Sequence, residues 1–582
     1  MKKILIALLS VMMVLSSFGC TKKDPEPSVD PEPIETDVQK EFHELQKSWF
    51  IEDISSDYSD MRFSLEDPSA LGIKDVEVTL GDIETEEDDT TYADRLAELK
   101  KYDVTQLTSD QQIAYKSMEF YFQLMQEFND FENDYTFAFT PNSGINNNLQ
   151  TIYTELDIRN EQDIKDIITL LNDSDRYITQ GIDYTKEQAS KGIIQPDSVI
   201  DQVIEGCQTF IANYDNNEVI KIINAKIDKI NIAGADEYKS QVEKAVKEVL
   251  IPAYQKIIDY YQSLKGTGTY SGRLCEYGAD GSDLYELIVR SKASTDASVE
   301  DLIDLMDTAI YESILGILDV MNEVELTEDY GFDDPYKILE HIKGKMTNDF
   351  PQYPDVEYTI DFLDPSITSP NVSAYYLIAP IDNLKKNVVK VNPAFSDADP
   401  NGMCITLAHE GYPGHLYQNT YYFTNHPDNE YRYVMSFLGY AEGWAQYVET
   451  YAYNYFLNNK KEVEYMQYNN IFSYCMYAYA DLQIHYNGWS VDDLTDYFSQ
   501  YFYESAAREN AEAIYDTVIG DPGMFLPYSV GLYKMWKMYT DTKDTLGKKF
   551  DFKAYNKMIL DAGECPLDVL EEQVAAFVEK NK

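Results

Sequence analysis

Cysteine is scarce in this sequence. The 582 residues contain six cysteines, and five of them lie scattered beyond the first twenty residues: Cys207, Cys275, Cys404, Cys475 and Cys565. Their number is odd and no C-x-x-C pair occurs, which argues against a disulfide framework and against a metal held by thiolates. We expect these five thiols to be free and buried.

Basic residues are also few. The chain has 47 Lys and Arg against 102 Asp and Glu, which gives a formal net charge of −55 and a pI near 4.3. Such a surface repels polyanions, so we expect neither nucleic acid nor an anionic lipid surface as a partner. We interpret the acidity as a solubility feature of a protein outside the cell. Nothing in the composition indicates an oligomeric state.

Long apolar runs are confined to the N-terminus, since no later stretch has the length and apolarity of a transmembrane helix. Lys2 and Lys3 precede an apolar run from Ile4 to Leu15, and small residues then lead to Cys20. This pattern resembles a bacterial lipoprotein signal with Cys20 as the lipidated residue. A plain secretory signal and an uncleaved anchor are the alternatives. We expect a protein outside the cytoplasmic membrane that meets the membrane only through an N-terminal lipid anchor.

Four regions are expected along the chain. Residues 1–20 form the lipoprotein signal peptide, and residues 21–40, rich in proline and acid, form an extended tether. A glycine-rich break at residues 266–272 divides the remainder into an N-terminal helical lobe, 41–270, and a catalytic helical lobe with a small β-sheet, 271–582.

The fold class is predicted to be mainly α. Residues 161–190 and 236–265 place apolar side chains at helical spacing, with Pro252 as a kink. In residues 355–363 and 373–392, by contrast, apolar and polar side chains alternate, and β-branched and aromatic residues are frequent. This pattern predicts two or three short strands. We expect these strands to form a small antiparallel insertion just before a helix that carries a His-Glu pair.

Histidine is rare as well, with six in the chain, yet His409-Glu410 is followed by His415. In the H-E-x-x-H pattern, two histidines one turn apart bind zinc and the glutamate activates water. Here the spacing is six residues, which puts the side chains about 120° apart on a regular helix. Pro413 and Gly414 could break the helix and swing His415 back. The alternative is a helix terminus with two incidental histidines.

A second acidic segment supplies a candidate third ligand. Glu442 follows His409 by 33 residues and opens a predicted helix, with Gln446 and Glu449 one and two turns later. Catalytic zinc sites commonly use two histidines and a glutamate and leave the fourth position open. We therefore expect Glu442 as the ligand, with Gln446 or Glu449 supporting the histidines. Without the histidines, exposed acids on a helix would be the better interpretation.

These residues resemble a family, the bacterial proteins grouped as domain-of-unknown-function family 885, which look related to thermolysin-like and oligopeptidase-like gluzincins. The resemblance rests on five segments: H-E-x-x-P-G-H (409–415), E-G-W-A (442–445), 374–392, 481–489 and 527–531. It implies a large helical bowl around a deep cleft.

The same resemblance implies roles for individual residues. Zinc would be held by His409, His415 and Glu442, with Glu410 as general base. Tyr528 and His485 are candidates to stabilise the oxyanion, although a buried, satisfied structural histidine is an equal alternative for His485. Two further residues, Tyr375 and Tyr376, lie on a predicted edge strand that could bind an extended peptide substrate.

The expected function is zinc-dependent hydrolysis of short peptides. The mode stays open between a carboxypeptidase, a dipeptidyl carboxypeptidase and an oligopeptidase. A cleft that recognises a free carboxylate needs a cation, and Arg508, Lys534 and Lys537 are near the motifs in sequence. The alternatives are a non-catalytic surface lipoprotein that binds peptide or metal, and a metal-dependent amidohydrolase acting on a non-peptide amide.

Overall fold

The computed structural model describes residues 36–83, 90–131, 135–363 and 372–582, and it is mainly α, as predicted. The helices of the first half are α1 (Asp37–Ile54), α2 (Tyr58–Ser64), α3 (Thr91–Leu99), α4 (Ser109–Asn129), α5 (Ile145–Glu155), α6 (Glu161–Ser190), α7 (Asp197–Ala212), α8 (Glu218–Ile230), α9 (Ala235–Ala245) and α10 (Ile251–Leu264). They are followed by α11 (Ala279–Ala293), α12 (Val299–Val320) and α13 (Pro335–Met346).

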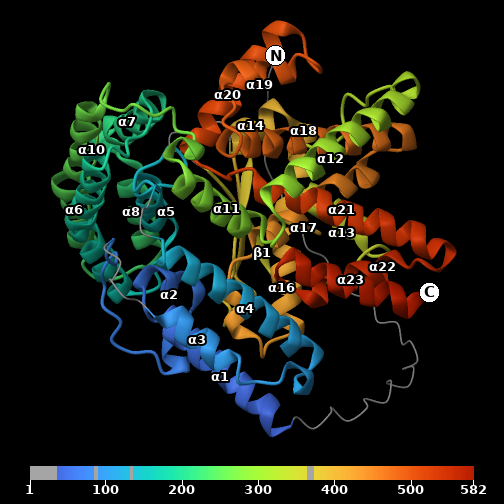
Figure 1. Cartoon of the computed structure of the whole chain (residues 1–582). Helices are drawn as coiled ribbons and strands as arrows, with labels where there is room; N and C mark the ends of the chain where they lie inside the picture. Colours follow the sequence, from blue (N-terminus) through green and yellow to red (C-terminus); the bar gives the residue numbers. More distant parts are fainter. Residues whose placement is uncertain (1–35, 84–89, 132–134, 364–371) are drawn as a thin grey trace.

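Three strands separate these helices from the remaining ones: β1 (Tyr358–Phe362), β2 (Ala374–Leu377) and β3 (Asn387–Val391). The helices after the sheet are α14 (Pro393–Ala398), α15 (Pro400–Glu410), α16 (His415–Asn425), α17 (Leu438–Phe456), α18 (Lys460–His485), α19 (Val491–Phe498), α20 (Glu504–Gly520), α21 (Leu526–Leu546), α22 (Phe552–Ala562) and α23 (Leu567–Asn581). In Figure 1 the strands lie between the group of α6, α7 and α10 and the group of α17 and α21.

Local sequence explains where several of these helices begin and bend. Thr36 caps α1 and forms a capping box with Gln39, so the helix begins at Asp37, inside the range predicted as tether. The predicted kink at Pro252 coincides with a π-helical segment, Val246–Leu250, directly before α10. Such a bulge accommodates a proline that cannot donate to the helical ladder.

The small sheet is mixed, which corrects the prediction of an antiparallel insertion. Its strand order is β1-β3-β2, with β2 antiparallel to β3 and β1 parallel to β3. Side chains alternate with a period of two in both arrangements, so the sequence pattern could not distinguish the directions. β2 is an edge strand of this sheet, as predicted for the segment that carries Tyr375 and Tyr376.

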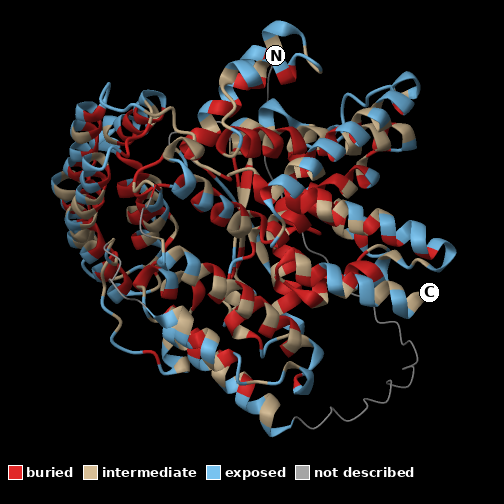
Figure 2. Ribbon diagram, viewed as in Figure 1, coloured by how far each residue is buried: buried red, intermediate tan, exposed pale blue. Residues whose placement is uncertain are grey.

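The core runs continuously from the first helices to the last. One cluster of buried apolar residues includes Phe42 of α1, Trp444 of α17 and Leu570 of α23. Figure 2 shows the buried residues concentrated in α16, α17 and α21, while α6 and α10 expose their outer faces. The predicted division into lobes at residue 270 stays a prediction.

Close packing of α17 on α21 depends on two glycines. A Cβ added to Gly443 would lie 2.7 Å from the Cα of Gly531, and one added to Gly531 would lie 2.2 Å from the carbonyl oxygen of Gly439. Because neither position has room for a side chain, the two helices approach backbone to backbone. This contact explains the glycine of E-G-W-A and places α21 beside the start of α17.

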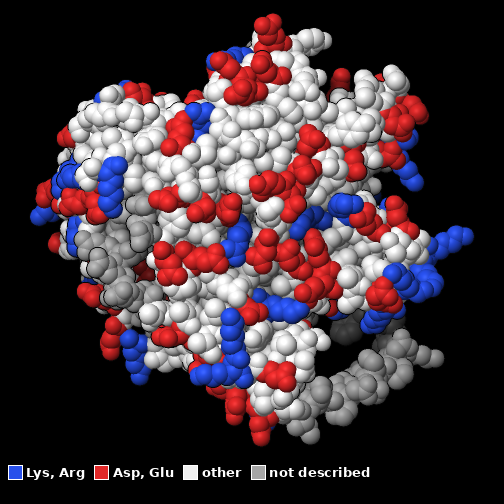
Figure 3. Space-filling model, viewed as in Figure 1, with Lys and Arg blue, Asp and Glu red and all other residues white. Residues whose placement is uncertain are grey.

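The surface is acidic, as the composition predicts. Figure 3 shows Asp and Glu spread over the visible face, with Lys and Arg interspersed among them. Within the described ranges, no helix is long and apolar enough to cross a membrane. The signal peptide, Cys20 and the tether up to residue 35 lie outside the described residues.

Candidate metal centre

The helix that carries His409 is broken where the sequence predicts. α15 ends at Glu410 and α16 begins at His415, so residues 411–414 form a tight connection between two helices. A Cβ on Gly414 would lie 1.6 Å from the carbonyl oxygen of His409, which makes glycine necessary there. The turn brings the rings of His409 and His415 to 4.8 Å between centroids, at 83° to each other.

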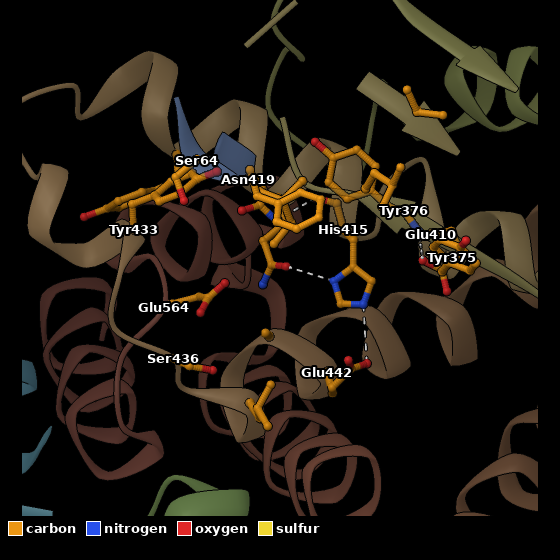
Figure 4. Close-up of a pocket in the computed structure, with 18 of the residues that line it drawn as sticks. Ser64, Tyr375, Tyr376, Glu410, His415, Asn419, Tyr433, Ser436, Glu442 and Glu564 are labelled. Carbon is orange, nitrogen blue, oxygen red and sulfur yellow. Dashed lines mark hydrogen bonds and ion pairs between the residues drawn. The ribbon is translucent and has the colours of Figure 1, made fainter. Parts of the chain in front are cut away.

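Glu442, from the first turn of α17, completes the cluster. Its Oε2 lies 3.3 Å from the Nε2 of His409 and 3.3 Å from the Nε2 of His415. These three ligand atoms lie within 4.8 Å of one another, and among the described residues they form the one group of His, Cys, Asp and Glu with this geometry. Figure 4 shows His415 and Glu442 facing each other in the cavity.

The cluster fits a zinc ion. Ligands about 2.0–2.1 Å from a tetrahedral zinc lie about 3.3 Å from one another, which matches both distances from Glu442 to the imidazoles. The Oε2 of Glu442 is buried and makes no hydrogen bond, as expected of an acceptor aimed at a cation. Two imidazole nitrogens and one carboxylate oxygen are also the donors of many catalytic zinc sites.

The outer nitrogens of both histidines have partners that set their orientation. The Nδ1 of His409 lies 3.0 Å from Glu449 Oε2 and 3.3 Å from the amide nitrogen of Gln446, while Gln446 also donates to Glu449 at 3.1 Å. The Nδ1 of His415 lies 3.4 Å from Gln418 Oε1. A carboxylate on Nδ1 holds the proton there and leaves Nε2 free as a ligand.

The electrostatics of the cluster favour a cation. Although burial opposes a charged ring, Glu442 and Glu449 raise the pKa of His409 well above its ordinary value. Conversely, the two histidines depress the pKa of Glu442 in spite of its burial. The buried carboxylates of Glu442 and Glu449 thus attract positive charge to the point where the three ligand atoms meet.

Glu410 lies beside the cluster and is oriented by the sheet. Its Oε2 accepts a hydrogen bond of 2.8 Å from the backbone N–H of Tyr376 in β2, and its Oε1 lies 3.8 Å from the Nε2 of His409. Burial raises the pKa of Glu410 above that of an ordinary glutamate, which suits a group that accepts and returns a proton. The Tyr376 hydroxyl donates to Asn387 at 2.7 Å, so this tyrosine contributes its backbone to the site.

A cavity of about 1110 Å³ opens onto the cluster. His409, Glu410, His415 and Glu442 all line it, as do the predicted residues Tyr375, Tyr376 and Tyr528. Burial, followed by the nearby carboxylates of Glu442 and Glu410, raises the pKa of Tyr528, so its hydroxyl stays protonated. The hydroxyl of Tyr375 donates to Glu155 at 3.2 Å, which ties β2 to α5.

His485 is not brought to the cluster, which corrects its candidate catalytic role. It is fully buried, its Nδ1 accepts from the backbone N–H of Leu274 at 3.2 Å, and its Nε2 donates to the carbonyl oxygen of Val518 at 2.9 Å. Both nitrogens are therefore used by the backbone, and burial lowers the pKa of His485 to about 4. It is the buried structural histidine that sequence reasoning kept as the alternative.

The cations named from the sequence also lie elsewhere. Arg508, Lys534 and Lys537 do not line the cavity and pair with acids of the surface helices. Charged residues that the sequence motifs did not indicate do line it, among them Arg432 and Glu564. Neither belongs to a motif, since Arg432 lies in a short 3-10 turn and Glu564 follows α22.

Trp444 explains why E-G-W-A accompanies the His-Glu segment. Its indole N–H donates to the carbonyl oxygen of Pro413 at 3.0 Å, and its ring is fully buried. The residue two positions after Glu442 thus fixes the connection that places His415. The two segments form one structural unit although they are far apart in sequence.

Comparisons with known proteins agree with this architecture. The profile of a family described as "Bacterial protein of unknown function (DUF885)" matches residues 67–574. The chain is similar in fold to a protein from Colwellia psychrerythraea described as a "putative lipoprotein", with a TM-score of 0.74 and 17% identity over 93% of this chain and 99% of that one. A search of curated proteins gave no match.

A second solved structure shares the fold. It is described as a "putative lipoprotein of unknown function" from Shewanella oneidensis, with a TM-score of 0.59 and 14% identity over 92% of this chain and 99% of that one. At these identities the likeness concerns the fold alone.

Proposed function

This chain belongs to the DUF885 family of bacterial proteins, whose description assigns no function, and we propose from its own side chains that it is a zinc-dependent peptidase acting on short peptides. One observation carries the proposal: His409, His415 and Glu442 converge within 4.8 Å in a large cavity, beside the buried Glu410. A cation-binding protein needs the three ligands, but it does not need a second carboxylate, that of Glu410, held beside the cluster by β2.

The residues divide the chemistry between them. When bound by the three ligands, a zinc ion supplies a Lewis acid that polarises a carbonyl and lowers the pKa of water toward neutrality. Glu410, held by the N–H of Tyr376, takes a proton from the attacking water and delivers it to the leaving amine. Tyr528 stays protonated and donates a hydrogen bond to the negative charge that develops on the carbonyl oxygen.

The edge strand β2 offers a way to hold a peptide. Residues 372–378 line the cavity beside Glu410, and an extended segment can pair with such an edge through its backbone. Because the cavity measures about 1110 Å³, an unfolded short peptide fits it better than a folded protein. This argues for peptides as the substrate class.

We propose that the protein is anchored outside the cytoplasmic membrane as a lipoprotein through Cys20. The supports are the signal-like N-terminus and the two solved proteins of the same fold, both described as putative lipoproteins. Labelling cells with a radioactive fatty acid tests this, since Cys20→Ala should abolish incorporation into the protein.

The test of the activity compares wild type with Glu410→Gln. Both should hold about one zinc per chain, while cleavage of a peptide library falls by about 10²–10⁴-fold in the variant. Glu464→Gln, a surface change on α18, is the matched control and should behave as wild type. A wild type without zinc, or equal cleavage by both proteins, refutes the proposal. If the wild type holds zinc but cleaves nothing, the non-catalytic binding protein is favoured. If it cleaves only non-peptide amides, the amidohydrolase is favoured.

A further inference from the structure

A buried cation, Arg432, lines the cavity, and the proposed chemistry does not use it. Arg432 lies in a 3-10 turn, Glu430–Tyr433, and is 3% exposed. Its Nη2 donates to the carbonyl oxygen of Ala562 at 2.9 Å and to that of Glu564, and its guanidinium lies 5.2 Å from the ring centroid of Tyr422. These contacts fix the side chain in place without neutralising its charge.

Arg432 differs from the other Lys and Arg residues that line the cavity. Arg62 and Arg159 both pair with Asp163 at 3.1 Å, and Lys386 pairs with Asp157. Within the described part of the chain, Arg432 forms no ion pair with an acid, and its Nε is buried without a hydrogen bond.

A buried charge without a counterion is costly for the fold. In a protein with a net charge of −55, where an acid could easily have been placed opposite, an unpaired guanidinium at a cavity wall points to an anion from outside.

Helix α16 relates this cation to the metal cluster. His415, Asn419 and Tyr422 all line the cavity, which puts them on one face of the helix. Tyr422 follows His415 by seven residues, or about 10 Å along the helix axis. Tyr422, over whose ring the guanidinium lies, is therefore about two helical turns from the proposed ligand His415, along the cavity wall.

That separation selects a kind of substrate. An extended peptide rises about 3.3 Å per residue, so about 10 Å corresponds to two or three residues beyond a bond held at the cluster. The guanidinium nitrogen Nη1, which the carbonyls of Ala562 and Glu564 do not use, can donate to a carboxylate, which is the anion that every peptide carries at its C-terminus.

We propose that Arg432 binds the C-terminal carboxylate of the substrate, so that the protein releases di- or tripeptides from the C-terminal ends of peptides. This specificity rests on the proposed peptidase function. Arg432 is therefore the proposed carboxylate-binding cation in place of Arg508, Lys534 and Lys537, because those side chains pair with acids of the surface helices.

Glu564 shares the wall with Arg432 and is an acid that could oppose this role. Figure 4 shows its carboxyl group facing the cavity, on the same side as Ser436 and Tyr433. Arg432 contacts the backbone of Glu564 and forms no ion pair with its side chain. Burial raises the pKa of Glu564 to about 7, although His415 and Arg432 act to lower it, so this carboxyl group offsets only part of the guanidinium charge.

Binding tests the inference independently of catalysis. Calorimetric titration of the full chain with hexaalanine and with its C-terminal amide should show at least 10-fold tighter binding of the free acid. Arg432→Gln should bring the two affinities within about twofold of each other, while Arg159→Gln, whose guanidinium already faces Asp163, should keep the preference. Equal affinity of wild type for acid and amide overturns the inference, and this comparison holds even if Arg432→Gln does not fold.

Product analysis separates the inference from the function it rests on. Mass spectrometry of hexaalanine digested by the zinc-loaded wild type should show free di- or trialanine early in the reaction, and the amide should be cleaved at least 10-fold more slowly. Binding of the free acid without any cleavage refutes the peptidase function and leaves the carboxylate site standing. Cleavage of acid and amide at equal rates supports the peptidase function and refutes the carboxylate site.

Discussion

At the scale of single residues, the site depends on which nitrogen of His409 is free. Glu449 lies 3.0 Å from Nδ1, so the proton stays on that nitrogen and Nε2 faces Glu442. Gln446 holds Glu449 in turn, at 3.1 Å. These two residues line the cavity without belonging to the three-residue cluster, yet they decide whether His409 can act as a ligand.

Replacing Glu449 by Gln should therefore weaken zinc binding without removing a ligand. The amide cannot hold the Nδ1 proton as a carboxylate does, and affinity should fall by about 10–100-fold. Competition with a chromogenic chelator measures this, with Glu464→Gln as the matched surface control. Unchanged affinity in Glu449→Gln would show that the contact with His409 is incidental.

Tyr528 offers a second prediction at this scale. Its protonated hydroxyl can stabilise negative charge that exists only in the transition state, so Tyr528→Phe should lower kcat by about 10²–10³-fold and leave KM nearly unchanged. Steady-state kinetics on one peptide separates the two constants. A rise in KM at constant kcat would assign Tyr528 to substrate binding instead.

At the scale of elements, the connection between α15 and α16 creates the candidate metal site. A regular helix would keep His409 and His415 on different sides, and the four residues between the two helices bring the rings to 4.8 Å. Trp444 of α17 secures this connection by its bond to Pro413. The candidate metal site thus lies where three helices meet.

Gly414→Ala tests the connection directly. The new Cβ would lie 1.6 Å from the carbonyl oxygen of His409, so the junction must open, at a cost of about 1–3 kcal/mol in the free energy of unfolding. Zinc content should fall with it. Gly344→Ala is the control, because this exposed glycine of α13 has open space around it and alanine should stabilise the helix by about 0.5–1 kcal/mol. Denaturant melts that cannot tell the two variants apart would contradict the prediction.

At the scale of the whole molecule, the N-terminal helices are joined to the helices of the candidate site by charge as well as by the common core. His426, just after α16, places Nδ1 at 2.7 Å from Asp110 of α4 and Nε2 at 3.8 Å from Asp561 of α22. Burial opposes the charge, but both carboxylates together raise the pKa of His426 to about 9. The contact joins residues that are 316 positions apart.

This contact makes part of the stability dependent on pH. Because the folded pKa lies above the unfolded value of about 6.5, the stabilisation is complete below pH about 6.5 and is lost as the pH rises through about 9. His426→Gln should lower the free energy of unfolding by about 1–2 kcal/mol at pH 6 and by almost nothing at pH 10. The value at pH 6 is smaller than the full pKa shift implies, because Asp110 is half exposed and solvent screens the ion pair. Urea melts of both proteins at the two pH values check this; a difference that does not shrink with pH would contradict it.

Much of the site could be predicted because its residues carry a chemical pattern. Histidine is rare in this chain, so a His-Glu pair with a second histidine and a Pro-Gly break stands out. Arg432 and Glu564 could not be found this way. Their types are common, and only the packing of Tyr422 and α22 around them leaves one guanidinium in a cavity without an acid.

The sequence by itself determined the mainly α class, the broken helix after Glu410 and the candidate ligands, because helical spacing, proline and glycine act locally. The tertiary structure decided the rest: the parallel pairing of β1, the burial of His485 against the backbone, and the cation in the cavity wall. These features depend on contacts between segments far apart in the chain. Side chains alternate with a period of two in parallel and in antiparallel strands. A histidine or an arginine looks the same in the sequence whether its nitrogens bind a ligand, donate to a carbonyl or have no partner.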